Sequence, residues 1–149
     1  MARIELNLPE NFSFSTDVRV RISDINYGNH LGNDALLSLI HEARLQFLQN
    51  RGFSELDVDG CGLILTDAVI VYKSQGFHGD LLTILAAVGD FNKYGCDFFY
   101  KVIRKNGGKE VARAKTGIVF FDYNRQKMVP VPAAFFKACG TQLAQPLST

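Results

Sequence analysis

The chain has 149 residues, of which 47% are hydrophobic and 21% are charged, and its formal net charge is +1. This length and balance exclude an intrinsically disordered chain and predict a single globular domain over residues 1–149. A net charge near zero gives no overall attraction to nucleic acid, and no stretch reaches the roughly 20 apolar residues of a membrane span. We therefore expect neither a nucleic acid nor a membrane as a partner.

The three cysteines indicate the cellular compartment. Cys61, Cys96 and Cys139 are odd in number and share no close spacing. This pattern favours free thiols in a reducing environment over a disulfide framework or a zinc site. The short apolar run near the N-terminus contains Arg3 and Glu5, which does not fit a signal peptide. We expect a cytoplasmic protein that binds no metal.

A polar loop separates the first predicted strand from a long apolar helix. Residues 18–22 (VRVRI) alternate apolar and basic side chains, which predicts a strand with one buried face that Asp24 continues. Over residues 33–50 the apolar side chains recur every three or four positions, as they do on a buried helix. Gly32 or Asn33 is expected to cap the start of this helix.

Four further strands are predicted after the helix, because their sequences are rich in β-branched and aromatic residues. They cover residues 62–74, 80–90, 94–105 and 109–122. Asn106-Gly107 lies between the last two and favours a tight hairpin, in which both central residues take positive φ. Pro132 precedes a short final helix, which is expected to direct Phe135 and Phe136 toward the core.

The order of these elements predicts the fold class. Consecutive strands with short links must be mostly antiparallel, because parallel pairs need long crossovers. One sheet that curls around one apolar helix buries both economically. We therefore expect an α+β chain with the hotdog fold, in which a curved, mostly antiparallel sheet of about five strands wraps around one long central helix.

The polar loop and the helix start resemble those of the 4-hydroxybenzoyl-CoA-type acyl-CoA thioesterases. The run R-I-S-D-I-N-Y-G-N-H-L-G-N-D-A over residues 21–35, with H-E-A-R at 41–44, is similar to the pattern D-x-D-x-x-G-H-V-N-N and the E-A-R helix of that family. Weaker similarities follow in order at Tyr72, at Gly79-Asp80 and in the stretch F-F-D-Y-N-R-Q-K-M-V-P-V-P. The resemblance covers about residues 17–137.

This resemblance implies hydrolysis of an acyl-CoA or acyl-carrier-protein thioester. Members of the family form homodimers or homotetramers in which the sheets of two chains join. Their site lies at the dimer interface, where the loop before the helix meets the partner's strands. They use an acidic residue of this loop and no cofactor, so coenzyme A enters only as part of the substrate.

The loop departs from the family pattern at its central position. When His30 is aligned, the usual catalytic aspartate falls on Asn26, while the earlier acidic position is kept as Asp24. An amide has no group that ionises near neutral pH, so it cannot act as a carboxylate base. Two readings therefore stand: a thioesterase with another base, or a non-catalytic acyl-thioester binding protein that has lost it.

The candidate catalytic residues are Asp24, Asn26, His30 and Asp67. Asp24 is either a general base for water or a structural turn residue. Asn26 would hold water or the thioester oxygen, and His30 would orient water or support the loop. Asp67 is expected on an apolar strand face with Leu63, Leu65, Val69 and Val71, where a carboxylate needs a partner or a shifted pKa.

The candidate substrate-binding residues are Asn33, Lys93, Arg104 and Lys105. Asn33 is a helix cap or a ligand, and free N–H groups at the helix start would favour negative charge on a thioester oxygen. The three basic residues would meet the phosphates of coenzyme A, or they are ordinary surface charges.

Other classes of protein do not fit this sequence. The segment G-N-H-L-G-N lacks the Lys-Ser/Thr ending and the glycine spacing of a nucleotide-binding loop. No nucleophile-elbow motif is present, which argues against a serine hydrolase. A hotdog regulator that binds DNA would need residues beyond this single domain.

Overall fold

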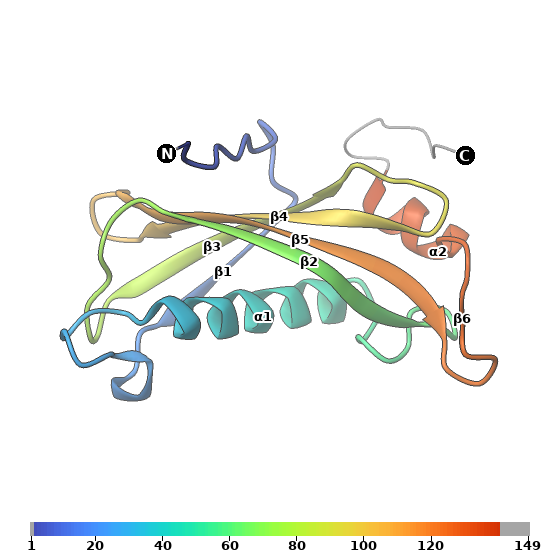
Figure 1. The fold of residues 1–149 in the computed structure, drawn as a ribbon, viewed down its shortest axis with the longest axis horizontal. Helices are drawn as coiled ribbons and strands as arrows, with labels where there is room; N and C mark the ends of the chain where they lie inside the picture. Colours follow the sequence, from blue (N-terminus) through green and yellow to red (C-terminus); the bar gives the residue numbers. More distant parts are fainter. Residues whose placement is uncertain (1, 141–149) are drawn as a thin grey trace.

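A computed structural model describes residues 2–140 of the chain (Figure 1). It contains one long helix, one sheet and short helical turns. The elements are β1 (Phe14–Arg19), the 3-10 helix η1 (Ile22–Asp24), α1 (Asn33–Asn50), β2 (Gly62–Tyr72), β3 (Leu81–Gly89), β4 (Gly95–Arg104), β5 (Glu110–Asp122), β6 (Lys127–Met128), α2 (Ala133–Phe135) and the π-helix η2 (Phe136–Gly140).

All the strands of the structure belong to one antiparallel sheet. Its strands lie in the order β1-β3-β4-β5-β2, and the two-residue β6 pairs with β5. Figure 1 shows α1 along one face of the curved sheet, while the N-terminal segment crosses the opposite face. The predicted α+β hotdog architecture is confirmed, and β2 is an edge strand of the sheet that residues 2–140 form.

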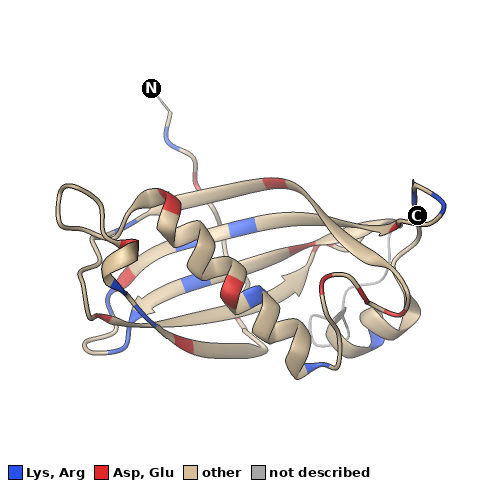
Figure 2. Ribbon diagram, turned by 90° about the horizontal axis from the view of Figure 1, so that it is seen from below, with Lys and Arg blue, Asp and Glu red and all other residues tan. Residues whose placement is uncertain are grey.

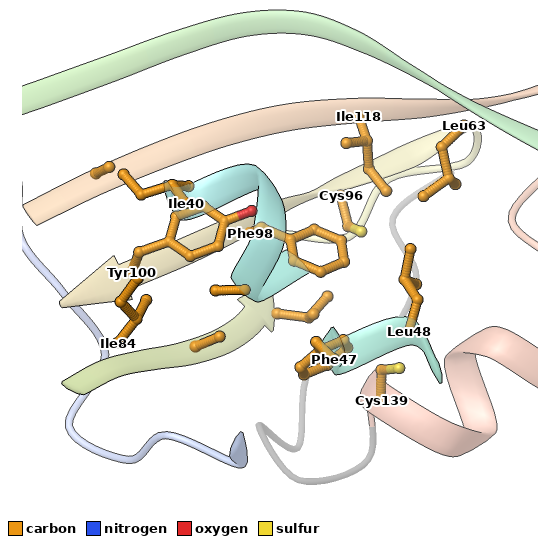
Figure 3. Packing of buried hydrophobic residues seen from close by; sticks show 14 of the residues in the cluster. Ile40, Phe47, Leu48, Leu63, Ile84, Cys96, Phe98, Tyr100, Ile118 and Cys139 are labelled. Atoms are coloured by element: carbon orange, nitrogen blue, oxygen red, sulfur yellow. The ribbon is translucent and has the colours of Figure 1, made fainter. Parts of the chain in front are cut away.

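The core lies between α1 and the face of the sheet that it covers. The helix buries the stripe predicted from its periodicity, including Ile40 and Phe47, neither of which is exposed. The Phe47 ring meets the Phe98 ring of β4 edge to face, with centroids 5.3 Å apart. Figure 3 shows these side chains packed together with others from β3, β4 and β5. Phe135, from the predicted final helix, is also fully buried.

The first strand is shorter than its pattern predicts. Strand β1 ends at Arg19, and the chain then turns through η1, so the side chain of Ile22 is 72% exposed. The turn is held by Asp24, whose Oδ2 accepts a hydrogen bond of 2.8 Å from the backbone N–H of Arg21. A side chain that caps the backbone in this way competes with strand pairing. Here the capped turn forms in place of the further strand residues that the alternating pattern predicts.

A β-bulge in β2 changes the face on which Asp67 lies. Leu65 pairs with Ile118 but Asp67 pairs with Gly117, so Thr66 is an extra residue in this strand. Every side chain after the bulge is therefore on the other face from the one that strict alternation predicts. The expectation that Asp67 shares an apolar face with Leu63 and Leu65 is wrong.

The β4–β5 hairpin forms where it was predicted, but with a different turn. The residues with positive φ are Gly107 and Gly108, at 89° and 72°, rather than Asn106 and Gly107. Lys109 closes the loop through its carbonyl, which accepts from the N–H of Arg104 at 2.9 Å.

Basic and acidic residues are interspersed along the ribbon in Figure 2, without a large region of one sign. None of the helices within residues 2–140 is long and apolar enough to span a membrane.

A buried polar network connects α1 to the middle of the sheet. Arg44, with a side chain only 4% exposed, donates from Nη1 to the Tyr100 hydroxyl at 3.4 Å. That hydroxyl lies 3.0 Å from Thr116 Oγ1, and Tyr100 and Thr116 are both completely buried. Burial raises the pKa of Tyr100, so the phenol stays protonated and available as a donor.

We expect Tyr100→Phe to lower the free energy of unfolding by about 1–3 kcal/mol, because Arg44 and Thr116 would lose a buried partner. Chemical denaturation followed by circular dichroism measures the change. Tyr123→Phe, at a residue that is 46% exposed, is the matched control and should change stability by less than about 0.5 kcal/mol. Equal stability of the two variants would mean that the network contributes nothing.

Candidate active site

The loop between β1 and α1 is shaped by its own amide groups. Asn26 Oδ1 accepts hydrogen bonds from the N–H of Gly28 at 3.0 Å and of His30 at 3.2 Å. Asn29 takes a positive φ of 66°, which asparagine tolerates better than most residues. The loop is tied to its surroundings by Leu31, whose N–H donates to the carbonyl of Gly76 at 2.8 Å. The loop therefore has a defined shape, in which Asn26 plays a structural part.

A cavity of about 670 Å³ opens between this loop and the start of α1; we call it the loop cavity. It is lined by Asn26, Tyr27, His30, Leu31, Gly32, Asn33, Asp34, Leu36, Tyr72, Ser74, Gln75, Gly76 and Val111. The structure thus brings the predicted Asn26, His30 and Asn33 together. It adds Tyr72 of β2, whose hydroxyl donates to the Asn33 carbonyl at 3.0 Å.

The start of α1 presents free backbone donors to this region. Gly32 is the N-cap and has no side chain to cap the helix, while Asn33 Oδ1 accepts from the N–H of Asp34 at 2.8 Å. Within residues 2–140, the N–H groups of Asn33 and Ala35 have no acceptor. Such donors at a helix start stabilise negative charge on a bound oxygen.

Asp24 lies beneath the loop rather than in the loop cavity. Its residue is 5% exposed, and its carboxylate also lies 3.5 Å from Arg21 Nε. Its carbonyl accepts from the N–H of Gly32 at 2.9 Å, which joins the end of η1 to the helix start. These contacts favour the structural alternative for Asp24.

Asp67 lies on the sheet face opposite α1, away from the loop cavity. Its side chain is 57% exposed and is paired with Lys115, with Nζ 2.9 Å from Oδ2. This ammonium group holds the pKa of the Asp67 carboxyl below its usual value. Its Oδ1 accepts from the N–H of Gly117, where an added Cβ would lie 2.2 Å from the same oxygen. The contacts favour a role in holding the bulge.

A second cavity, of about 600 Å³, runs along α1 beside β2; we call it the helix groove. Its apolar walls include Leu37, Leu56 and Leu65, which are 38%, 77% and 40% exposed. Its polar end contains His41 and Glu55, with Nε2 2.5 Å from Oε1, and Glu55 also contacts Arg44 at 3.4 Å. His41 and Glu55 are 14 residues apart in the chain, so no spacing in the sequence marks them as a pair.

Among the predicted basic residues, Lys93 is separated from Arg104 and Lys105 by the length of β4. Arg104 at the end of β4 pairs with Asp80 at 2.9 Å and lines a cavity of about 430 Å³ with Arg19. Lys105 pairs instead with Asp17 of β1. Lys93 precedes the other end of β4, so the ten residues of that strand, about 33 Å, separate it from Arg104.

An aromatic ring links Arg104 to the loop cavity. The Arg104 guanidinium carbon lies 5.3 Å from the centroid of the Phe77 ring, within the range of a cation–π contact. The same ring meets the His30 imidazole at 5.4 Å between centroids. The cavity lined by Arg19 and Arg104 and the loop cavity are therefore neighbours. Lys93 lines neither of them.

Within residues 2–140, no group of three or more His, Cys, Asp or Glu side chains has the arrangement of a metal site. The three thiols are free, and burial raises the pKa of Cys139 to about 12, which makes it a poor nucleophile.

Solved structures of thioesterases have the same fold. A 1,4-dihydroxy-2-naphthoyl-CoA thioesterase from Synechocystis is 21% identical over 89% of this chain and 98% of its own, with a TM-score of 0.79. A DHNA-CoA thioesterase from Staphylococcus aureus is 15% identical over 91% and 97%, with a TM-score of 0.78. A probable thioesterase, YbaW, from Escherichia coli is 20% identical over 83% and 94%, with a TM-score of 0.68.

No curated protein sequence matches the chain. The sequence profile of the thioesterase-like superfamily, in contrast, matches residues 20–139, which include the loop, α1 and the whole sheet after β1. The match covers most of the chain and agrees with the resemblance found in the loop motif. The chain belongs to the thioesterase-like superfamily.

Proposed function

We propose that the protein hydrolyses the thioester of an acyl-CoA or an acyl carrier protein, at a site completed by a second copy of the chain. The loop cavity at the start of α1 is the observation that carries this proposal. It combines free backbone donors, polar side chains and an adjoining apolar groove. A thioester needs these three features: an oxyanion site, a way to place water, and cover for the acyl group.

Arg104 and Arg19 support binding of a phosphorylated carrier. They line a cavity next to the loop cavity, and guanidinium groups hydrogen-bond phosphate oxygens well. A coenzyme A or phosphopantetheine arm would run from this cavity past Phe77 and His30 to the helix start. Lys93 and Lys105 line neither of these two cavities and take no part in this arrangement.

The free edge of β2 supports the second copy. Within residues 2–140 no strand pairs with the outer side of this eleven-residue strand, although the N–H of Leu63 near its start donates to the carbonyl of Glu55. The exposed Leu65 of β2 adjoins the exposed Leu37 of α1. A long apolar edge pairs readily with another strand, and a two-fold pairing with itself closes the assembly. Joined edges would cover the helix groove and set the partner's residues against the loop cavity.

A binding protein without catalysis is the second candidate function. Asn26 occupies the family's catalytic position, and its amide oxygen is engaged by two N–H groups of the loop. Asp24 and Asp67 are held by structural contacts. A chain that kept the cavity but lost its base would bind the thioester and not cleave it.

A panel of acyl-CoAs, assayed by release of the free thiol, distinguishes these functions. We expect saturable turnover with kcat on the order of 1 s⁻¹ or faster for the best acyl group, as for ordinary enzymes. Tight binding without thiol release by the wild-type protein would support the binding protein instead. Turnover that appears only in Asn26→Asp would do the same.

We expect sedimentation to give a dimer or a tetramer at micromolar concentration. Ala68→Glu introduces a charge at an exposed position of the β2 edge and should shift the protein toward the monomer. Ile4→Glu, on the N-terminal segment, is the control and should not. A wild-type protein that sediments only as the monomer would contradict the composite site.

Arg104→Gln should raise KM for an acyl-CoA by about tenfold, the effect of losing roughly one charge-assisted hydrogen bond. KM for the corresponding acyl-pantetheine, which lacks the nucleotide phosphates, should not change. Lys93→Gln is the matched control and should leave both values as they are. An equal effect of Arg104→Gln on both substrates would place the phosphates elsewhere.

A further inference from the structure

The carboxylates that could act as a base differ in the contacts that they already make. Asp24 caps a backbone turn, Asp67 is paired with a lysine, and Glu55 is shared between a histidine and an arginine. The carboxylate of Asp34 has no hydrogen bond and no ion pair within the part of the chain that the structure describes. It is exposed, in the first turn of α1.

Asp34 lines both the loop cavity and the helix groove. Its charge also acts on the loop cavity, because burial and the neighbouring Asp34 carboxylate raise the pKa of the Tyr72 phenol. A thioester held here would have its carrier arm in the loop cavity and its acyl group along Leu37 and Leu65. The scissile carbon would then lie where the cavities meet, beside Asp34.

Gly32 leaves the space that the Asp34 carboxylate occupies. A Cβ added to Gly32 would lie 2.8 Å from Asp34 Oδ1, which is closer than real side chains approach. The backbone of Gly32 has φ −67° and ψ 146°, a conformation open to any residue. The turn itself therefore does not require a glycine, but a side chain at this position would displace the Asp34 carboxylate from the place that it occupies.

We propose that Asp34 is the general base that activates water in the thioester hydrolysis, in place of the loop carboxylate that Asn26 replaces. This inference rests on the proposed function. It adds a residue that neither the loop motif nor the resemblance singles out, since the helix start alone would explain an acidic residue at this position by its dipole.

The proposed step balances without a cofactor. Asp34 accepts a proton from water as the water oxygen bonds to the thioester carbon, and the carbonyl electron pair moves onto its oxygen. The free N–H groups of Asn33 and Ala35 would stabilise that oxyanion. The intermediate then collapses, the C–S bond breaks, and the proton held by Asp34 passes to the leaving sulfur. The products are the free acid and the carrier thiol.

A variant and its matched control test this role with the best acyl-CoA of the panel. Asp34→Asn should lower kcat by about 10²–10⁴, the usual effect of losing a general base, with KM changed by less than about threefold. Asp59→Asn, an acid-to-amide change at an exposed aspartate that lines neither cavity, is the matched control and should retain wild-type kcat. Thermal melting checks that each variant is folded.

Gly32→Ala provides a second test that keeps every carboxylate. The added methyl group should displace the Asp34 side chain and lower kcat by about tenfold or more, while the melting temperature stays close to wild type. Hydrolysis in oxygen-18 water, limited to one turnover, should label the free acid and leave Asp34 unlabelled.

The possible outcomes distinguish a failure of the Asp34 assignment from a failure of the proposed thioesterase function. If the wild type and Asp34→Asn hydrolyse acyl-CoA equally well, the assignment of Asp34 fails and the thioesterase function stands. Label in the Asp34 carboxyl group would show a nucleophile and overturn the general-base step. If the wild type hydrolyses none of the acyl-CoAs, the proposed function fails, and this assignment fails with it.

Discussion

The packing of α1 across one face of the sheet is the constraint on which the site depends. Leu36, Ile40 and Phe47 are each at most 1% exposed, so the helix cannot slide or rotate without opening a cavity in the core. Losing one such contact costs about 2–5 kcal/mol, a large part of the stability of a domain. The first turn of the helix is therefore held at a fixed depth beside β2, where Tyr72 bonds the carbonyl of Asn33.

Two short segments hold the loop against that helix start. The carbonyl of Asp24 accepts from Gly32, and the carbonyl of Gly76 accepts from Leu31, so the loop is fastened on both sides. The buried carboxylate of Asp24 keeps its own turn closed. Groups that bind a reacting carbonyl need fixed geometry, since small displacements lower rates steeply. The contacts of Asp24 with the turn and the helix start are therefore enough to explain an aspartate at this position without a catalytic role.

The sequence predicts the fold well because most of its signals are periodic. The buried stripe of residues 33–50 and the strands after it follow patterns that tertiary packing reinforces. The errors come from single residues that break a period. Thr66 inserts one position into β2 and moves Asp67 to the opposite face, and no composition signal marks such a bulge. Likewise, Asp24 turns the chain where alternation predicts more strand.

Only those parts of the candidate site that lie close together in the sequence could be predicted from it. The loop motif identified Asn26, His30 and Asn33, which do line one cavity. His41 and Glu55 come together only because the chain folds back after α1, and their pairing has no sequence spacing to reveal it. Nothing in the sequence distinguishes Asp34, because an acidic residue in a first helical turn is common for stability alone.

The apolar surface that a single chain leaves exposed along the helix groove fits the proposed binding of an acyl group and of a second chain. A single chain exposes Leu37, Leu56 and Leu65 along one groove, although burying a leucine side chain is worth about 1.5–3 kcal/mol. An apolar wall beside a free strand edge is unfavourable in an isolated monomer, and it is useful only when an acyl group or another chain covers it. Covering would also exclude water from the groove and strengthen the electrostatic interactions at the helix start. In such a site, association of the chains and stabilisation of charge on the substrate would depend on the same buried surface.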